Sequence, residues 1–61
     1  MDYTAYAAEN IRMFVSLRRN HMDKWRSSGM KDSEALHQAL LANGRAKHWE
    51  RELAKVLSQN N

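Results

Sequence analysis

The apolar residues in the first half of the chain recur with the period of an α-helix. Six of them share one broad face at about 3.6 residues per turn: Ala7, Ile11, Phe14, Leu17, Met22 and Trp25. Ala8 and Val15 widen this face on one side. Tyr6 and Met13 widen it on the other, so that it covers about 200°, whereas a helix with one neighbour needs roughly 100°. The pattern predicts a helix over residues 2–28 that contacts more than one other helix.

Capping residues mark where the helices begin and end. Asp2 is the expected N-cap of the first helix, with Thr4 as the alternative. Gly29 fits the left-handed position that follows a helix C-terminus in a Schellman motif. Asp32 is the expected N-cap of a second helix. The turn is therefore predicted over residues 29–31.

The second half of the chain carries a heptad-like apolar seam. Its members alternate in spacing between four and three residues: Ala35, Ala39, Ala42, Ala46, Trp49, Leu53 and Val56. A turn at Asn43-Gly44 would normally reset the phase of this pattern, and the phase does not change there. The seam predicts one helix over residues 32–58. The alternative is a break near Gly44, which would give three helices.

These elements make an all-α fold with a single domain over residues 1–61, an antiparallel two-helix hairpin. A chain this small buries too little surface to be very stable alone, and it has no cysteine for disulfides. We therefore expect a homodimer, in which two hairpins form a four-helix bundle. The expected dimer or partner interface comprises Ile11, Phe14, Val15, Arg18, Met22, Leu36, Leu40 and Trp49.

Three arginines recur every seven residues along the first helix: Arg12, Arg19 and Arg26. At 1.5 Å per residue they form a row with neighbours about 10.5 Å apart, which could follow the phosphate backbone of a nucleic acid. The alternative is an edge of the bundle paired with acids on the second helix, with Arg26 near Glu34 and Arg12 near Glu50. We prefer the paired edge, because regularly spaced helix charges commonly form such edges.

Arg18 differs from this row because it falls inside the apolar arc of the first helix. A buried guanidinium without a partner is too costly to persist, so it must reach water, stack on an aromatic ring or find a carboxylate. We expect it to fix helix register rather than to form a ligand site.

The sequence shows no pattern for catalysis or for metal binding. His37 and His48 are eleven residues apart, about 16 Å along a helix, unlike the close spacing of a helical metal pair. No glycine-rich phosphate loop and no nucleophile with a neighbouring base is readable. We therefore expect a protein that is not an enzyme, with no cofactor, no metal and no small-molecule substrate.

The N-terminal residues and the lack of long apolar runs indicate the cellular compartment in which the protein is expected. No apolar run approaches the roughly 20 residues of a membrane span, so no membrane association is expected. The first residues lack the basic region and apolar core of a signal peptide. With cysteine absent as well, the sequence predicts a cytoplasmic protein.

Two stretches resemble a known group of proteins. They are Ala7–Phe14 (AAENIRMF) and Ala42–Glu50 (ANGRAKHWE). Over nearly its whole length the chain resembles the small early proteins that lambdoid bacteriophages encode between their exonuclease and excisionase genes. The resemblance implies expression early after infection or induction in a bacterial host cell. It also implies a regulator that binds a host or phage protein and modulates host physiology or the choice between lysis and lysogeny.

Overall fold

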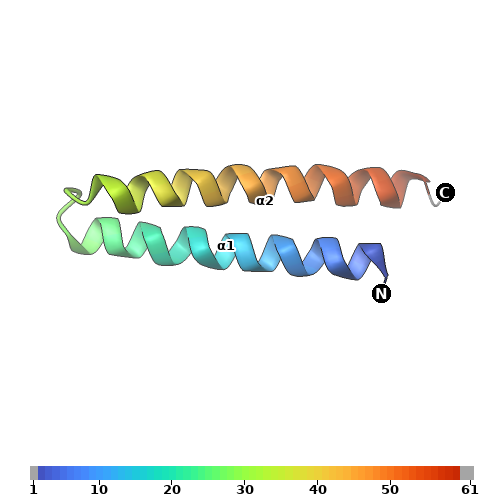
Figure 1. Ribbon diagram of the computed structural model, residues 1–61, viewed down its shortest axis with the longest axis horizontal. Helices are drawn as coiled ribbons and strands as arrows, with labels where there is room; N and C mark the ends of the chain where they lie inside the picture. Colours follow the sequence, from blue (N-terminus) through green and yellow to red (C-terminus); the bar gives the residue numbers. More distant parts are fainter. Residues whose placement is uncertain (1, 60–61) are drawn as a thin grey trace.

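The structure is a computed structural model that describes residues 2–59. It contains two antiparallel helices, α1 (Tyr3–Ser27) and α2 (Ser33–Gln59), with both ends of the chain at the same end of the hairpin (Figure 1). The predicted all-α hairpin is confirmed. The helix boundaries differ from the predicted ones by a single residue at each end.

The start of α1 is fixed by its expected N-cap. The Thr4 N–H donates to Oδ1 of Asp2 at 3.1 Å, and the Tyr6 N–H donates to the Asp2 carbonyl at 3.0 Å. The first bond satisfies an amide group that has no backbone partner in the first turn, and the second is the first regular backbone hydrogen bond of α1. Asp2 is therefore the N-cap, and the alternative of Thr4 is wrong.

The end of α1 is a Schellman motif. Gly29 adopts φ +73°, and its N–H donates to the Arg26 carbonyl at 3.0 Å. The Met30 N–H donates to the Trp25 carbonyl, also at 3.0 Å. Met30 itself has φ +65°, a left-handed conformation that is uncommon for a residue with a side chain. Two consecutive left-handed residues thus reverse the chain.

Two side chains hold the connection between the helices. Oγ of Ser28 donates to the Trp25 carbonyl and accepts from the backbone N–H of Asp32 at 2.9 Å. Oδ1 of Asp32 accepts from the Ala35 N–H at 3.0 Å, which is the hydrogen bond of an N-cap. The expected cap of the second helix is confirmed.

α2 continues past Asn43 and Gly44 without interruption. Three helices with a break near Gly44 is therefore the wrong alternative. A Cβ added at Gly44 would meet nothing within 4 Å, so no close approach of the helices requires glycine there.

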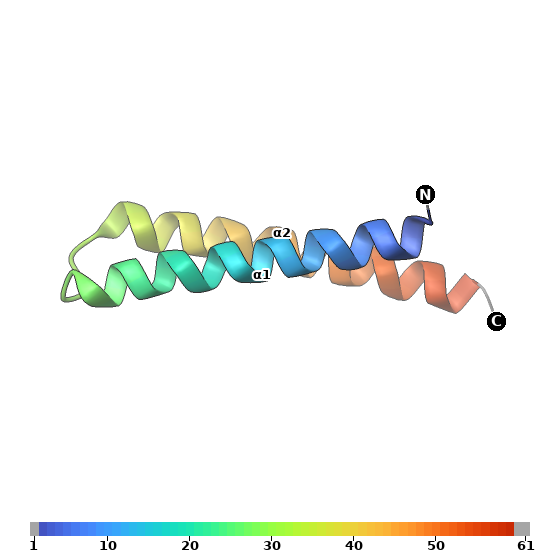
Figure 2. The ribbon, with the colours of Figure 1, turned by 90° about the horizontal axis from the view of Figure 1, so that it is seen from below.

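The interior of the hairpin is built from alanine. Five side chains are buried within residues 2–59: Ala7, Ala35, Ala39, Ala42 and Ala46. No larger side chain in this part of the chain is fully buried. Small residues let two helices approach closely, and the helices cross each other near their middles when viewed from the side (Figure 2). Because the seam is narrow, the larger apolar side chains lie beside it rather than inside it.

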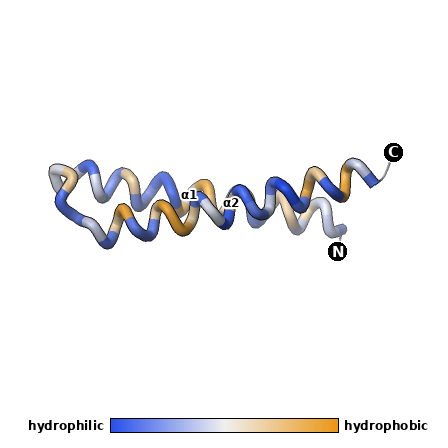
Figure 3. The backbone as a smooth tube through the Cα atoms, turned by 90° about the horizontal axis from the view of Figure 1, so that it is seen from above, coloured by the Kyte–Doolittle hydropathy of each residue, from blue (hydrophilic) through white to orange (hydrophobic). Residues whose placement is uncertain are grey.

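The molecule is an elongated slab one helix thick. Its principal extents are 47 × 17 × 12 Å, and its radius of gyration is 14.1 Å, against about 10.5 Å for a globular chain of this length. Figure 1 looks onto one of its two broad faces. Along both helices hydrophobic positions alternate with hydrophilic ones (Figure 3). In the described part of the chain, neither helix combines the length and the apolar character needed to cross a membrane.

Candidate interaction surfaces

Contacts across the seam distinguish the two broad faces of the slab. At about 100° per residue, Tyr6 and Trp49 lie on one side of the seam through Ala7 and Ala46. Their rings meet edge to face with centroids 5.4 Å apart. The opposite side carries a hydrogen bond between α1 and α2, which joins Arg18 to Asn43. The two faces therefore differ in chemistry.

The first surface is the aromatic face, defined by five exposed side chains: Tyr3, Tyr6, Met13, Leu17 and Leu41. Their exposed fractions run from 39% for Leu17 to 48% for Met13. Tyr6, Met13 and Leu17 project about 80–120° away from the direction of Ala7, on the same side. The arc on α1 is thus wider than α2 can cover, as the width of the apolar pattern predicts. Large apolar groups remain in water as a result.

One end of the aromatic face is a cluster of rings. Trp49 is half-buried and packs against Tyr6, with Tyr3 at 6.4 Å and His48 at 5.6 Å between ring centroids. Tyr3 and Tyr6 also lie 6.4 Å apart. Tilted and edge-to-face ring pairs at such distances are attractive beyond the area they bury. The cluster therefore fastens the open end of the hairpin, away from the turn.

The second surface is the arginine face, defined by Arg12, Arg19 and Arg26, all exposed. The three side chains project about 100–140° away from the direction of Ala7, on the side opposite Tyr6. Their spacing along α1 keeps them on one straight edge. The face also includes Val15 and Met22, which are half-buried beside the seam.

The predicted ion pairs between the arginine row and α2 do not form. Within residues 2–59 the ion pairs join neighbours on one helix, Arg12 to Glu9 at 4.0 Å and Lys55 to Glu52 at 3.6 Å. Arg26 is not paired with Glu34. The arginine side chains project away from α2, although Glu34 and Glu50 lie at the same levels along the hairpin axis as Arg26 and Arg12. The interpretation as a paired edge is therefore wrong.

Arg18 occupies a position between the helices. It is half-buried, and its Nη1 donates to Oδ1 of Asn43 at 2.8 Å. The acceptor is an uncharged amide, so the positive charge of the guanidinium is not neutralised there. This bond joins the helices near their middles and supports the expected register role. In the sequence, Asn43 indicates only a possible turn. Spacing alone does not identify the residue on the other helix that a seam arginine contacts.

Most of the expected interface set is half-buried against the other helix of the same hairpin. Seven of its eight members are half-buried: Ile11, Phe14, Val15, Arg18, Met22, Leu36 and Trp49. The eighth, Leu40, is 61% exposed. Phe14 also lies under the guanidinium of Arg45, whose Cζ is 5.9 Å from the ring centroid. Met13 and Tyr6 are among the most exposed apolar side chains of α1. The sequence pattern places them only at the margin of the apolar face of that helix.

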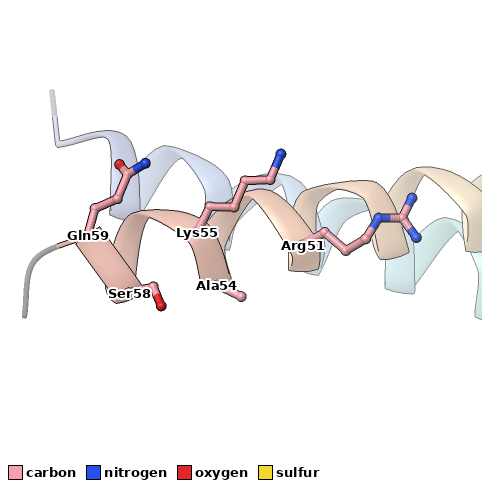
Figure 4. A pocket seen from close by; sticks show the side chains of 5 residues that line it. All are labelled: Arg51, Ala54, Lys55, Ser58 and Gln59. Atoms are coloured by element: carbon pink, nitrogen blue, oxygen red, sulfur yellow. The ribbon is translucent and has the colours of Figure 1, made fainter.

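A shallow groove on α2 offers no enclosed site. It is lined by Arg51, Ala54, Lys55, Ser58 and Gln59, which all come from one helix and are all exposed (Figure 4). Ligand sites in proteins bury most of the ligand between several elements, which a single exposed helix surface does not do. Across residues 2–59, no three histidine or acidic side chains gather as they would around a metal ion.

No protein family, curated protein or solved structure matches this chain in comparisons of either sequence or fold.

Proposed function

We propose that this chain is a small non-enzymatic regulator that works as a homodimer, two hairpins packed into a four-helix bundle. One observation carries the proposal. The hairpin buries only alanine fully, while eight large apolar side chains stay exposed in the described residues. A surface of 4652 Å² exceeds the roughly 4100 Å² expected for a globular monomer of this mass. A second copy would remove the excess from water.

The resemblance described above supports a setting for this dimer. We propose that it is made early in phage infection and acts in the cytoplasm of the bacterial host cell. There it binds a host or phage protein and modulates host physiology or the lysis–lysogeny decision. The exposed tyrosines Tyr3 and Tyr6 provide the kind of anchor that protein interfaces use.

Self-association is tested by the solution mass and by the concentration dependence of unfolding. We expect sedimentation equilibrium at micromolar concentrations to give twice the 7.1 kDa of one chain. Because unfolding then includes dissociation, a tenfold rise in concentration adds about 1.4 kcal/mol of stability and raises the melting temperature by several degrees. A mass of one chain with a melting temperature independent of concentration contradicts the homodimer.

A second candidate function is nucleic-acid binding through the arginine face. The observation that favours it is that no ion pair joins the row to α2 within the described residues, and that Arg19 and Arg26 take part in none there. The row therefore keeps its charge available for an anion. Three arginines about 10.5 Å apart form a straight edge about 21 Å long, suited to a duplex backbone.

Salt dependence tests this candidate. If the three arginines contact three phosphates, the affinity for a duplex should fall with salt with a log–log slope of about −2.7. Changing Arg12, Arg19 and Arg26 to alanine should remove most of that slope. The charge-matched control changes three lysines outside the row, Lys24, Lys31 and Lys55, to alanine. Equal loss in both triple variants, or no salt-sensitive binding by the wild-type chain, rules the candidate out.

A further inference from the structure

We propose that the aromatic face is the surface on which the second copy of this chain docks, and that the arginine face points outward in the dimer. This inference rests on the proposed homodimer and adds which of the two broad faces forms it. Each hairpin is one helix thick, so a second hairpin can pack against either of its two broad faces.

The distribution of exposed apolar groups favours the aromatic face. Five of the eight large exposed side chains belong to it, and they run along the hairpin from Tyr3 to Leu17 and across to Leu41. On the arginine face Leu40 is strongly exposed, whereas Val15 and Met22 are already half-buried. Because apolar burial drives association roughly in proportion to area, the aromatic face gains more from being covered.

Charge on the aromatic face is balanced. At about 100° per residue, Lys24 lies on its α1 side and Arg45 on its α2 side. Glu34 and Glu52 fall beside them on α2, which gives two positive and two negative charges. In a two-fold interface the same patch meets itself, so a neutral patch with both signs produces no net repulsion.

Charge on the arginine face opposes self-association. Arg12, Arg19, Arg26, Lys47 and Arg51 fall on this side, against two acids, Glu50 and the Arg12 partner Glu9. Two copies meeting here would place an excess of positive charge against its own image. Like charges facing each other across an interface are costly, so this face suits an anionic partner rather than a second copy.

The size of the face is of the order that a stable dimer needs. The broad face extends over 47 × 17 Å, a footprint of about 800 Å², comparable in order of magnitude to the surface that each partner buries in a standard interface. Face-to-face packing would also make a bundle of two layers, in which Tyr6 and Leu17 become interior groups.

Leu40 and Leu41 provide a matched pair for the test, since at about 100° per residue they fall on opposite sides of the α2 seam, Leu41 on the side of Trp49. In the full-length chain, Leu41→Lys should raise the dimer dissociation constant about 100-fold, because each substitution occurs twice in a two-fold interface. Leu40→Lys should change it by less than about threefold. Sedimentation equilibrium gives the constants, and circular dichroism checks that both variants remain helical.

Spin labels provide a second measurement that does not weaken the interface with a charge. The chain has no cysteine, so Leu41→Cys and Leu40→Cys each carry one label. The label at position 41 should be immobilised in the dimer, and the label at position 40 should stay mobile. The reverse pattern, or dissociation by Leu40→Lys alone, overturns the inference while leaving the homodimer intact. A monomeric wild-type chain overturns the homodimer itself.

Discussion

Ala46→Glu is expected to destabilise the hairpin by about 3 kcal/mol or more, because the new side chain overfills the seam and carries an unpaired charge into it. Ala46 is 0% exposed, in the seam between the two helices. A chain of this size has a total stability of only about 3–9 kcal/mol, so the variant should lose a third or more of it and unfold at a much lower urea concentration. Far-UV circular dichroism with urea titration measures the effect.

Ala54→Glu is the control for this substitution. Ala54 lies on the same helix, and its side chain is exposed in the shallow groove. The same change there should alter stability by less than about 0.5 kcal/mol. Similar losses in the two variants would mean that the alanine seam is not the packing surface of the hairpin.

The sequence was sufficient for the parts of the fold that depend on local chemistry and on period. Asp2, Gly29 and Asp32 end the helices through hydrogen bonds to nearby backbone groups, so their spacing alone identifies them. The alternation of four and three residues through Gly44 likewise predicts one continuous helix. Each of these inferences concerns residues within a few turns of one another.

Contacts between the helices were harder to predict, because they depend on where each side chain points around its helix as well as on its position along the axis. Arg26 and Glu34 lie at matching heights along an antiparallel pair, yet the arginine row turns away from α2. Arg18 instead reaches Asn43, a residue whose sequence context suggested a turn. The left-handed Met30 was also missed, since a methionine carries no local signal for that conformation.

The width of the seam links the fold to the candidate surfaces. Alanine at four successive seam positions of α2 brings the helices close together, which leaves no room between them for leucine or methionine. The larger side chains are therefore displaced to the two broad faces. A hairpin with so narrow an interior leaves its larger apolar side chains at least partly in water. The exposed leucines are therefore a consequence of the buried alanines.

Trp49→Ala is expected to lower stability by about 2–3 kcal/mol, less than for a fully buried tryptophan because Trp49 is half-buried. The loss combines buried area with the ring contacts to Tyr3 and Tyr6, which hold the open end of the hairpin. Urea titrations followed by circular dichroism, at one protein concentration, give the difference. Trp49→Phe should recover about half of the loss, because it keeps one ring in the cluster. Lys47→Ala, a change at an exposed residue outside the ring cluster, should cost less than about 0.5 kcal/mol. A Trp49→Ala variant as stable as Lys47→Ala would show that the ring cluster contributes nothing to folding.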